Sequence, residues 1–540
     1  MLEPILAALD PEQRAAATLP DGPAQIIAPA GSGKTTTMVA RLAVLLSRGV
    51  APDCICVVTF NRDAALDLAA RVERRLAAFV PAAASIEVRT LHALARQVLL
   101  DAGEGRDIVA DRLPLLRAAR RRVVAETPTL TPLEPSQLDT SLSAFKIEGR
   151  APPEDARPVF EAYAELLRIR GAVDFDDLVV RAGDLLETEP ALRRRWQSRF
   201  SHVCVDEFQD VDAAQLRLVR LLALPENNLF VVGDDDQTIY AWRLADVRRI
   251  LRFSADYPDA RRVMLATNYR CPARVVVASA RMVAVNRERF EKPIRAPANA
   301  TGSDAAITAW NTAGPAWTDA LARLAAVEEA AGRTLCFLSR TRSELTPILL
   351  ALLHAGVRHS TAIPPIVENE RITALIEAGR ALDTPEHPFH VLRRLRAGRG
   401  WSRDNPASDH LGDEDHGALD ALLGWATGFS RVNGFVSAYD AARARIAALR
   451  DPAATVELAT VHASKGREWE TVVLIGFEAD RIPNRRSIMD ADDPERALEE
   501  ERRLAYVALT RATRQLILGF DPRRPSPFLA EMGFTLTARA

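Results

Sequence analysis

Short apolar runs alternate with longer amphipathic stretches along most of this chain. Seven runs have the length and composition of buried strands: Gln25–Ala28, Cys54–Thr59, His202–Val205, Leu229–Gly233, Val263–Leu265, Leu335–Leu338 and Thr471–Ile475. Several are followed by a turn and then a helical pattern, which is typical of parallel sheets covered by helices. The tracts Leu113–Glu126 and Pro158–Arg170 predict long helices between strands. The pattern therefore predicts an α/β fold.

The strand pattern also predicts two α/β cores, each interrupted by an insertion. The strand-bearing parts are 1–90 and 200–265, and separately 263–365 and 452–530. Prolines within 127–136 and the polar segment 384–417 mark joints. Four histidines in the second segment match no standard metal-ligand spacing: His387, His390, His410 and His416. We therefore expect a solvated loop there.

Composition narrows the class of protein. The chain has 540 residues, of which 48% are hydrophobic and 26% charged. These values are ordinary for a globular protein of several domains and exclude a disordered, collagen-like or disulfide-scaffold protein. The formal net charge of −2 excludes a uniformly basic protein but leaves room for a local basic channel. The basic residues are mainly arginine, since lysine occurs only at Lys34, Lys146, Lys292 and Lys465.

Two further features bear on the compartment. The five cysteines have neither a disulfide framework nor a zinc spacing: Cys54, Cys56, Cys204, Cys271 and Cys336. The first residues lack a basic n-region, and no apolar run approaches the length of about 18 residues that spans a membrane. We expect a soluble, cytoplasmic protein that does not contact membranes.

The segment Ile26–Thr36 carries the clearest chemistry. An apolar strand leads into the small-residue loop APAGSG, then Lys34 and Thr35, then a helical pattern over Thr37–Ser47. Such a loop wraps phosphate with backbone N–H groups at a helix N-terminus. Lys34 would reach the β- and γ-phosphates and Thr35 would bind Mg²⁺. Ala28 stands in place of the first glycine of the usual pattern.

A second segment, Ser201–Asp210, supplies the carboxylates that phosphoryl transfer needs. A buried strand ends at Asp206, which is placed to bind Mg²⁺. Glu207 follows it and would polarise the attacking water. A DE pair by itself is often only the turn at a strand end, but here it follows a phosphate-binding loop.

Taken together, these segments resemble the UvrD/Rep/PcrA-like superfamily 1A DNA helicases. The resemblance spans nearly the whole chain and consists of ten segments in the family's order. They are Leu9–Arg14 (Q motif), Ala28–Thr35 (motif I), Val58–Ala65 (motif Ia), Thr90–His92, Asp174–Leu178, Val205–Asp210 (motif II), Val232–Arg243 (motif III), Asn268–Arg270 (motif IV), Thr460–Glu468 (motif V) and Glu500–Ala512 (motif VI).

The resemblance implies ATP and Mg²⁺ as cofactors. The implied catalytic residues are Lys34, Asp206, Glu207, Gln237, Arg270 and Arg511. The implied nucleotide-binding residues are Gln13, Arg14, Ala30, Gly31, Ser32, Gly33, Lys34, Thr35, Thr36, Tyr269 and Glu468, with Thr35 and Asp206 as metal ligands. In this family Gln13 would read adenine and Tyr269 would stack on it. Gln237 would sense the γ-phosphate, and Arg270 and Arg511 would act as arginine fingers.

The resemblance also implies a binding site for single-stranded DNA. Its residues would be Phe60, Asn61, His92, Tyr240, Trp242, Arg243 and His462. Aromatic side chains stack on bases without regard to sequence. From the residues alone, core packing of Tyr240 and Trp242 is an equally good interpretation.

The family's architecture implies two RecA-like parallel-sheet cores with mainly helical insertions. Core 1A would comprise 1–90 and 186–262, with insertion 1B at 91–185. Core 2A would comprise 263–365 and 452–530, followed by a tail at 531–540. Only 366–451 remains for insertion 2B, which would be reduced relative to familiar members.

The expected function is an ATP-dependent 3′→5′ DNA helicase or translocase that acts on single strands and on junctions of single- and double-stranded DNA. It would serve DNA repair, replication or recombination. Two alternatives stay open. One is a translocase that depends on a partner, such as a repair nuclease. The other is a nucleotide-gated DNA-binding switch, for example in anti-phage defence.

Overall fold

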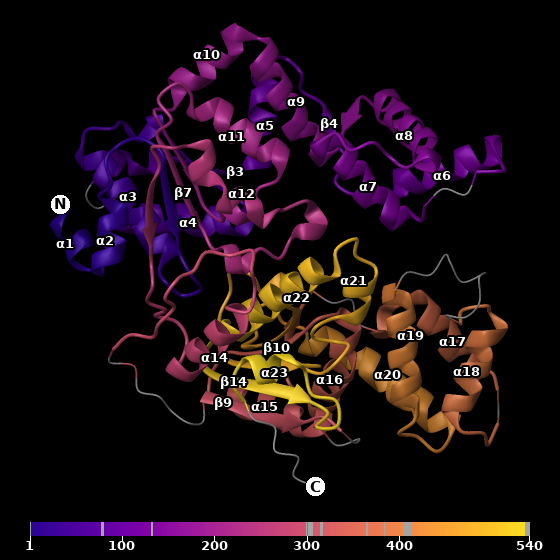
Figure 1. Ribbon diagram of the computed structural model, residues 1–540. Helices are drawn as coiled ribbons and strands as arrows, with labels where there is room; N and C mark the ends of the chain where they lie inside the picture. Colours follow the sequence, from indigo (N-terminus) through magenta and orange to yellow (C-terminus); the bar gives the residue numbers. More distant parts are fainter. Residues whose placement is uncertain are drawn as a thin grey trace. The chain divides into compact units, whose positions relative to one another are not determined.

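The computed structural model describes residues 2–76, 80–130, 133–298, 300, 306–313, 317–362, 366–382, 384–402 and 413–534. The chain forms two compact units (Figure 1). Unit 1 comprises Met1–Tyr269 and Glu288–Ile294, and unit 2 comprises Arg270–Arg287 and Arg295–Ala540. All five cysteines lie in the described part of the chain, and no disulfide links them. None of the helices in that part is long and apolar enough to cross a membrane.

Unit 1 is built on a six-stranded sheet in which every neighbouring pair is parallel, in the order β3-β2-β6-β7-β1-β8. Its strands are β1 (Ala24–Ile27), β2 (Ile55–Thr59), β3 (Glu87–Thr90), β6 (His202–Val205), β7 (Leu229–Gly233) and β8 (Arg261–Met264). Its helices are α1 (Glu3–Ala7), α2 (Pro11–Ala17), α3 (Lys34–Ser47), α4 (Arg62–Leu76), α5 (Leu91–Asp101), α9 (Phe175–Thr188), α10 (Pro190–Arg199), α11 (Ala213–Ala223), α12 (Val247–Leu251) and α13 (Phe253–Asp256).

Alternate residues of these strands enter two separate hydrophobic cores. Ile26 and Val57 pack on one face of the sheet, and Ile27 and Val58 pack on the other. Because both faces are covered by helices, the strands read as continuous apolar runs instead of alternating ones. This is why the strand positions could be predicted to within a few residues.

A helical insertion with its own core follows α5 in unit 1. It contains the short parallel pair β4 (Asp107–Ile108) and β5 (Ala172–Val173), and the helices α6 (Leu113–Glu126), α7 (Pro135–Glu148) and α8 (Arg157–Ile169). Its core is formed by side chains such as Leu116, Leu142 and Tyr163. The helix predicted at Leu113–Glu126 coincides with α6.

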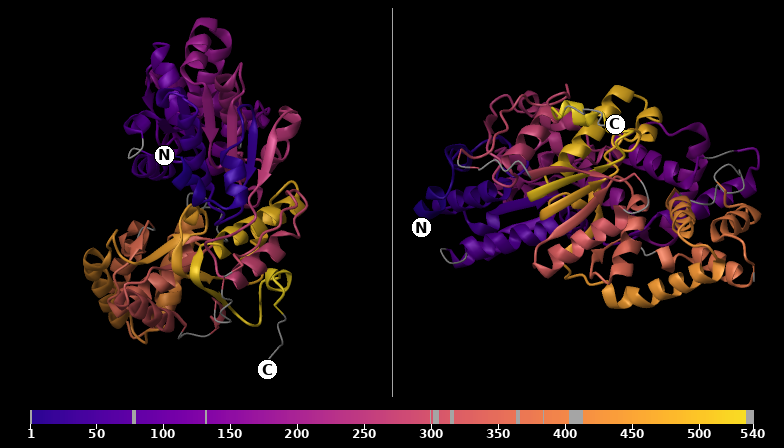
Figure 2. Two further views of the ribbon diagram at one scale, coloured as in Figure 1. Left: turned by 90° about the vertical axis from the view of Figure 1, so that its left-hand side faces the viewer. Right: turned by 90° about the horizontal axis from the view of Figure 1, so that it is seen from below.

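Unit 2 contains a second six-stranded parallel sheet, in the order β11-β12-β10-β13-β14-β9. Its strands are β9 (Ile307–Asn311), β10 (Leu335–Ser339), β11 (Ser360–Thr361), β12 (Val456–Thr460), β13 (Trp469–Ile475) and β14 (Ala512–Phe520). Its helices are α14 (Ala273–Val283), α15 (Trp317–Ala330), α16 (Arg342–Ala355), α17 (Glu370–Arg380), α18 (Pro388–Gly398), α19 (Asp413–Ala426), α20 (Val432–Leu449), α21 (Arg485–Met489), α22 (Pro494–Leu509) and α23 (Phe528–Glu531). Figure 2 shows strands and helices of each unit from two further directions. The predicted α/β class with two parallel-sheet cores is confirmed.

Two expectations need correction. The expected boundary between residues 262 and 263 falls inside β8, which pairs with β1 in the first sheet. A three-residue apolar run carries no signal for which sheet it joins, so periodicity alone could not place it. The described parts of the segment 384–417 are also not an irregular loop, because they contain α18 and the start of α19.

Helix α18 forms because its few apolar residues share one face. Val391 and Leu392 are buried in the core of unit 2, while its arginines are mostly exposed. His387 caps the helix by accepting a hydrogen bond from the Phe389 N–H at 3.2 Å. The Nδ1 atom of His416 lies 3.4 Å from the Arg396 guanidinium. His410 lies outside the described residues.

Candidate nucleotide and nucleic-acid sites

The loop between β1 and α3 has the backbone form of a phosphate cradle. Gly31 and Gly33 have positive φ values of 69° and 81°, which favour glycine. A Cβ atom on Gly33 would lie 2.5 Å from Gln13 Nε2, so a larger residue would displace the Gln13 amide. The buried hydroxyl of Ser32 has no hydrogen-bond partner among the described residues. Free donors at the start of the 14-residue helix α3 are what a bound phosphate requires. Ala30 and Thr36 belong to the same loop and first helical turn.

Lys34 faces the carboxylates that follow β6. Its Nζ atom lies 3.0 Å from Glu207 Oε1 and 3.1 Å from Oε2. Burial alone would lower the pKa of Lys34, but the carboxylates of Glu207, Asp234 and Asp206 outweigh it and raise the pKa. The side chain is therefore a fixed ammonium ion beside the cradle.

Glu207 is held in an unusual backbone conformation at the end of β6. Its φ of 53° is uncommon for a residue with a side chain, and such strain concentrates at functional sites. Gln209 Nε2 donates to Glu207 Oε2 at 2.5 Å, and the Glu207 N–H donates to Asp206 Oδ1 at 3.0 Å. Asp206 and Glu207 therefore both lie near Lys34.

A continuous polar chain leads from this site to the loop after β7. The Asp234 N–H donates to Gln209 Oε1 at 3.0 Å. Gln237, which is 3% exposed, donates from Nε2 to Asp234 Oδ2 at 2.6 Å. The proposed sensor Gln237 is therefore connected to Glu207 through two side chains.

An aromatic ring and an amide flank the cradle on its other side. The Tyr269 hydroxyl donates to Asp10 Oδ2 at 2.7 Å, its N–H donates to Gly31 O at 2.9 Å, and the residue is 52% exposed. Gln13 donates from Nε2 to Ser32 O at 2.9 Å and completes a capping box with Asp10. Arg14 is exposed on α2. A half-exposed ring beside a phosphate cradle fits a purine base.

The residues present also fit Mg²⁺ held together with ATP. Thr35 is the second residue of α3, and Asp206 is 8% exposed at the end of β6. Mg²⁺ keeps several waters and takes few protein ligands besides phosphate, so a hydroxyl and one carboxylate suffice. Accordingly, no group of three metal-ligating side chains is needed, and the described residues contain none.

The predicted nucleotide residues of unit 2 are already engaged within that unit. Arg270 Nε donates to Glu468 Oε2 at 2.6 Å. Arg511 is 1% exposed and donates to the carbonyl oxygens of Val507 at 2.9 Å and Arg467 at 3.1 Å. Two residues with separate predicted roles, Arg270 and Glu468, therefore bind each other.

Three aromatic side chains of unit 1 form a ladder. The Phe60 and Tyr240 rings stack with centroids 4.8 Å apart, and Tyr240 meets Trp242 edge-on at 6.3 Å. Trp242 is 58% exposed, which excludes core packing for this residue. The Arg243 guanidinium lies 5.1 Å from the Trp242 ring centroid. The residues Ala241–Arg243 form a 3-10 turn, so the strand spacing behind the core-packing interpretation does not apply.

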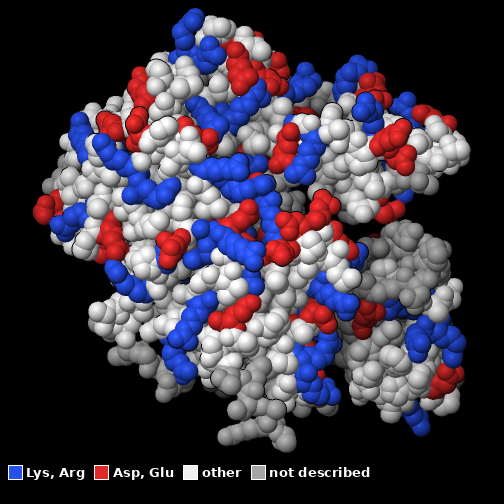
Figure 3. Space-filling model, viewed as in Figure 1, with Lys and Arg blue, Asp and Glu red and all other residues white. Residues whose placement is uncertain are grey.

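The ladder borders a cavity of about 540 Å³ in unit 1. Its lining includes Phe60, His92, Trp242 and Arg243. It also includes more carboxylates than cations: Asp111, Asp139, Asp174, Asp176, Asp210 and Asp212 against Arg112 and Arg243. This cavity is therefore not the basic channel that the neutral net charge allowed. On the face drawn in Figure 3, basic and acidic side chains are interspersed.

The other predicted DNA-binding residues, Asn61, His92 and His462, lie in three different environments. Asn61 Oδ1 accepts a hydrogen bond from the Ala64 N–H at 2.8 Å at the start of α4. His92 packs edge-on against Phe175 at 5.5 Å, and burial lowers its pKa. His462 lies in unit 2, where burial and the charges of Arg340 and Lys465 lower its pKa to about 4. Both histidines are therefore neutral at pH 7.

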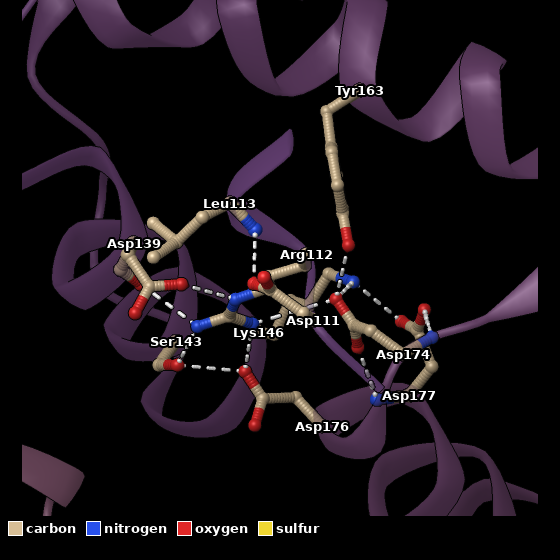
Figure 4. Close-up of polar contacts among 10 residues, drawn as sticks. All are labelled: Asp111, Arg112, Leu113, Asp139, Ser143, Lys146, Tyr163, Asp174, Asp176 and Asp177. Atoms are coloured by element: carbon tan, nitrogen blue, oxygen red, sulfur yellow. Dashed lines mark hydrogen bonds and ion pairs between the residues drawn. The ribbon is translucent and has the colours of Figure 1, made fainter. Parts of the chain in front are cut away.

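The cavity is closed on one side by an ionic network that sequence reasoning missed (Figure 4). Arg112 donates to Asp176 Oδ2 at 2.5 Å and to Ser143 Oγ at 2.5 Å, and it also pairs with Asp139. Lys146 lies 2.8 Å from Asp174 Oδ2. These contacts fasten α6 and α7 to the start of α9. A single sequence offers no signal for Arg112, which is 62 residues from Asp174.

The network predicts how Lys146 contributes to stability. Burial would raise the pKa of Asp174, but Lys146 and other donors lower it to about 2. Because the folded pKa is below the unfolded one, this stabilisation is present above the unfolded value of 3.8 and is lost as pH falls through about 2. Lys146→Met should therefore destabilise the insertion by about 1.5–3 kcal/mol at pH 7.

Thermal unfolding and hydrogen exchange of α6–α8 would measure this effect. Arg122→Met is the matched control, because Arg122 forms an exposed ion pair with Glu126 one helical turn away, and such surface pairs contribute little to stability. Equal effects of both substitutions would contradict a stabilising role for the network.

Fold and sites together define a P-loop ATPase with two parallel-sheet cores and an aromatic surface beside the loop that follows β7. The chain belongs to the UvrD-like helicase family. Residues 9–258 match the model of the UvrD/REP helicase N-terminal domain, and residues 442–521 match the UvrD-like helicase C-terminal domain.

Named relatives extend over nearly the whole chain. The ATP-dependent DNA helicase UvrD2 of Mycobacterium tuberculosis is 28% identical over 602 residues, covering 98% of this chain and 82% of the relative. The ATP-dependent DNA helicase PcrA of Leuconostoc citreum is 27% identical, with 98% and 85% covered. PcrA of Bacillus subtilis is 26% identical, with 95% and 83% covered. The predicted family is confirmed.

Proposed function

We propose that this protein is an ATP-dependent DNA helicase that moves 3′→5′ along single-stranded DNA. Its work would lie in DNA repair, replication or recombination. The observation that carries the proposal is the polar chain from Lys34 through Glu207, Gln209 and Asp234 to Gln237. Gln237 is three residues before Tyr240, a member of the aromatic ladder, so the loop that senses ATP also presents a surface for bases. The direction rests on the resemblance to the family.

We assign a residue to each step of ATP hydrolysis. The cradle and Lys34 would hold the phosphates, while Glu207 would orient and deprotonate the attacking water. Mg²⁺, bound with ATP by Thr35 and Asp206, would neutralise phosphate charge. Arg270 and Arg511 would stabilise the charge that develops on the transferred phosphoryl group. Gln13 and Tyr269 would hold the adenine, with Glu468 near the ribose.

The DNA site would use stacking instead of base-specific hydrogen bonds. Trp242 is the most exposed member of the ladder and would take the first base. Arg243, His92 and Asn61 would contact the strand from unit 1, and His462 would contact it from unit 2. Stacking serves every base, which suits an enzyme that must move along any sequence.

Trp242→Ala should weaken binding of single-stranded DNA. Loss of one stacking ring costs about 1–3 kcal/mol per base, which corresponds to roughly a 5- to 150-fold rise in Kd. Fluorescence anisotropy with a labelled oligo-dT would measure it. Trp310→Ala is the control, because Trp310 packs against the core of unit 2. If the Trp242 variant binds DNA like wild type, the ladder is not the stacking surface.

The division into subdomains remains part of the proposal. Helices α17 to α20 would form the reduced 2B-like insertion, and α6 to α8 would belong to insertion 1B. A reduced 2B motivates a second candidate, a translocase that unwinds duplex only with a partner such as a repair nuclease.

Two assays test the proposed function. ATP hydrolysis should rise strongly when single-stranded DNA is added, and an unstimulated rate would refute the motor. Unwinding of 3′-tailed, 5′-tailed and forked duplexes should be confined to substrates with a 3′ tail. Displacement of streptavidin from a strand end without unwinding would favour the partner-dependent translocase. Stimulated hydrolysis with neither activity would favour a nucleotide-gated switch.

A further inference from the structure

The chain passes between the two units three times. It leaves unit 1 after Tyr269, returns at Glu288 and leaves again at Arg295. The short segment Asn286–Lys292, here called the strap, contains the second passage. Both of its ends are fixed by hydrogen bonds and ion pairs to motif segments of the unit in which they lie.

The first end of the strap is fixed to α22, the helix that carries motif VI. Arg502 donates to Asn286 Oδ1 at 2.5 Å, and Asn286 Nδ2 donates to Glu499 O at 3.1 Å. The Arg287 N–H donates to the Glu499 carboxylate at 2.7 Å. Arg502 is itself held by both oxygens of Glu531, at 2.7 and 3.0 Å. Asn286 is 5% exposed, so this end is anchored inside unit 2.

The second end is fixed to the loop after β7, which carries motif III. The fully buried Lys292 ammonium lies 2.7 Å from Asp234, 2.5 Å from Asp235 and 2.9 Å from Asp236. Arg289 pairs with both oxygens of Asp236, at 3.0 and 2.8 Å. Burial alone would lower the pKa of Lys292, but the three carboxylates outweigh it and raise the pKa. Removing one partner of such a buried cluster would leave uncompensated charge, so this end is firmly held.

The unit 1 anchor is shared with the proposed γ-phosphate sensor. Asp234 accepts a hydrogen bond from Lys292 at Oδ1 (2.7 Å) and another from Gln237 at Oδ2 (2.6 Å). Its N–H donates to Gln209, which holds Glu207. A displacement of the strap would therefore move the carboxylate that orients Gln237.

The strap has almost no slack between its anchors. Only Glu288 lies between Arg287, whose N–H binds Glu499 in unit 2, and Arg289, which pairs with Asp236 in unit 1. Two residue steps span at most about 7 Å when fully extended. A larger movement of α22 cannot be absorbed by this connection and must reach the motif III loop.

We propose that the strap is a taut tether that couples movement of α22 to the orientation of Gln237, with Lys292 as a positioning residue. This inference rests on the proposed function and adds a physical link between motifs VI and III. Closure of the cores on ATP would be transmitted through the covalent chain to the loop that bears Tyr240 and Trp242. The strap thus links ATP state to the DNA-binding surface.

Slackening the strap tests the tether while every anchoring side chain is retained. Two glycines inserted after Glu288 add up to about 7 Å of chain. The control is the same insertion after Gly332, an exposed turn residue with open space around it. The strap insertion should reduce DNA stimulation of ATP hydrolysis about tenfold, a typical allosteric coupling. The affinities for a fluorescent ATP analogue and for oligo-dT should stay within about twofold of wild type.

Weakening the anchor at either end of the strap should also reduce DNA stimulation of ATP hydrolysis. Asn286→Ala loosens the unit 2 end and Lys292→Met loosens the unit 1 end, and each should lower the stimulated kcat with little change in the KM for ATP. Because both act on one tether, the double variant should be no worse than the more impaired single variant. If Lys292→Met fails to fold, which its melting curve would show, Asn286→Ala and the insertion still decide the question.

The outcomes separate the two proposals. A wild-type protein whose ATPase ignores single-stranded DNA refutes the proposed function. If single-stranded DNA stimulates ATP hydrolysis equally in the wild type and in the strap-insertion variant, the tether is refuted and the proposed function stands. Additive losses in the double variant would also overturn the tether, because they indicate two unrelated local defects.

Discussion

The Glu207→Gln protein is expected to bind ATP and single-stranded DNA but to hydrolyse ATP about 10²- to 10⁴-fold more slowly than wild type, the usual contribution of a general base. The substitution keeps the size of the side chain and removes its charge. Lys34 keeps Asp206 and Asp234 as neighbouring carboxylates, so its ammonium form should persist. ATP binding should therefore survive the loss of catalysis.

Single-turnover hydrolysis and nucleotide binding, measured on the same preparation, would check this prediction. Glu73→Gln makes the same chemical change on the exposed face of α4 and should leave both unchanged. A Glu207→Gln rate within about threefold of wild type would show that another group activates the water, since even a modest general base contributes more than this.

The residues of the phosphate site could be predicted because each signal is local. The strand, loop and helix around Lys34 are consecutive in sequence, and Asp206 and Glu207 directly follow a buried strand. Parallel strands bring their carboxyl ends to one edge of a sheet, so these local segments meet without further information. The observed distance of 3.0 Å between Lys34 and Glu207 agrees with that expectation.

Contacts that depend on distant segments could not be predicted in the same way. Tyr269 and Asp10 are 259 positions apart, and no periodicity links them. Lys292 stood out because lysine is rare in this chain, but nothing in the sequence pointed to Asp234 as its partner. Arg112 is one of many arginines and carried no signal at all. Such partners are fixed by tertiary packing, which a pattern of apolar residues does not encode.

The charge beside the proposed DNA site was equally beyond what the sequence could predict. A near-neutral total permitted a local basic channel. The cavity beside Arg243 and His92 instead carries several aspartates, which pair with Arg112 and Lys146 to hold the insertion in place. Composition counts charges but does not tell which of them neutralise each other inside the fold.

The Arg270→Ala protein is expected to lose about 10³-fold or more in kcat for DNA-stimulated ATP hydrolysis, which is the usual worth of an arginine finger. Its melting temperature should change little, because Glu468, which pairs with Arg270, is exposed. Arg270→Lys should rescue little of the rate, since an ammonium cannot reproduce the planar fork that binds two phosphate oxygens.

Two controls separate a finger from a structural role for Arg270. Arg274→Ala removes an exposed arginine from the first turn of α14 and should leave the rate unchanged. Glu468→Gln removes the carboxylate that engages Arg270, so a catalytic arginine should then remain active. If Arg270→Ala and Glu468→Gln lower kcat equally, the Arg270–Glu468 ion pair itself is what matters.

Arg511 would then be the remaining candidate for the finger, although its guanidinium also donates to the carbonyl groups of Val507 and Arg467. Because Arg511 is buried, its replacement would combine catalytic and folding defects, and Arg270 therefore gives the cleaner test of how unit 2 contributes to hydrolysis.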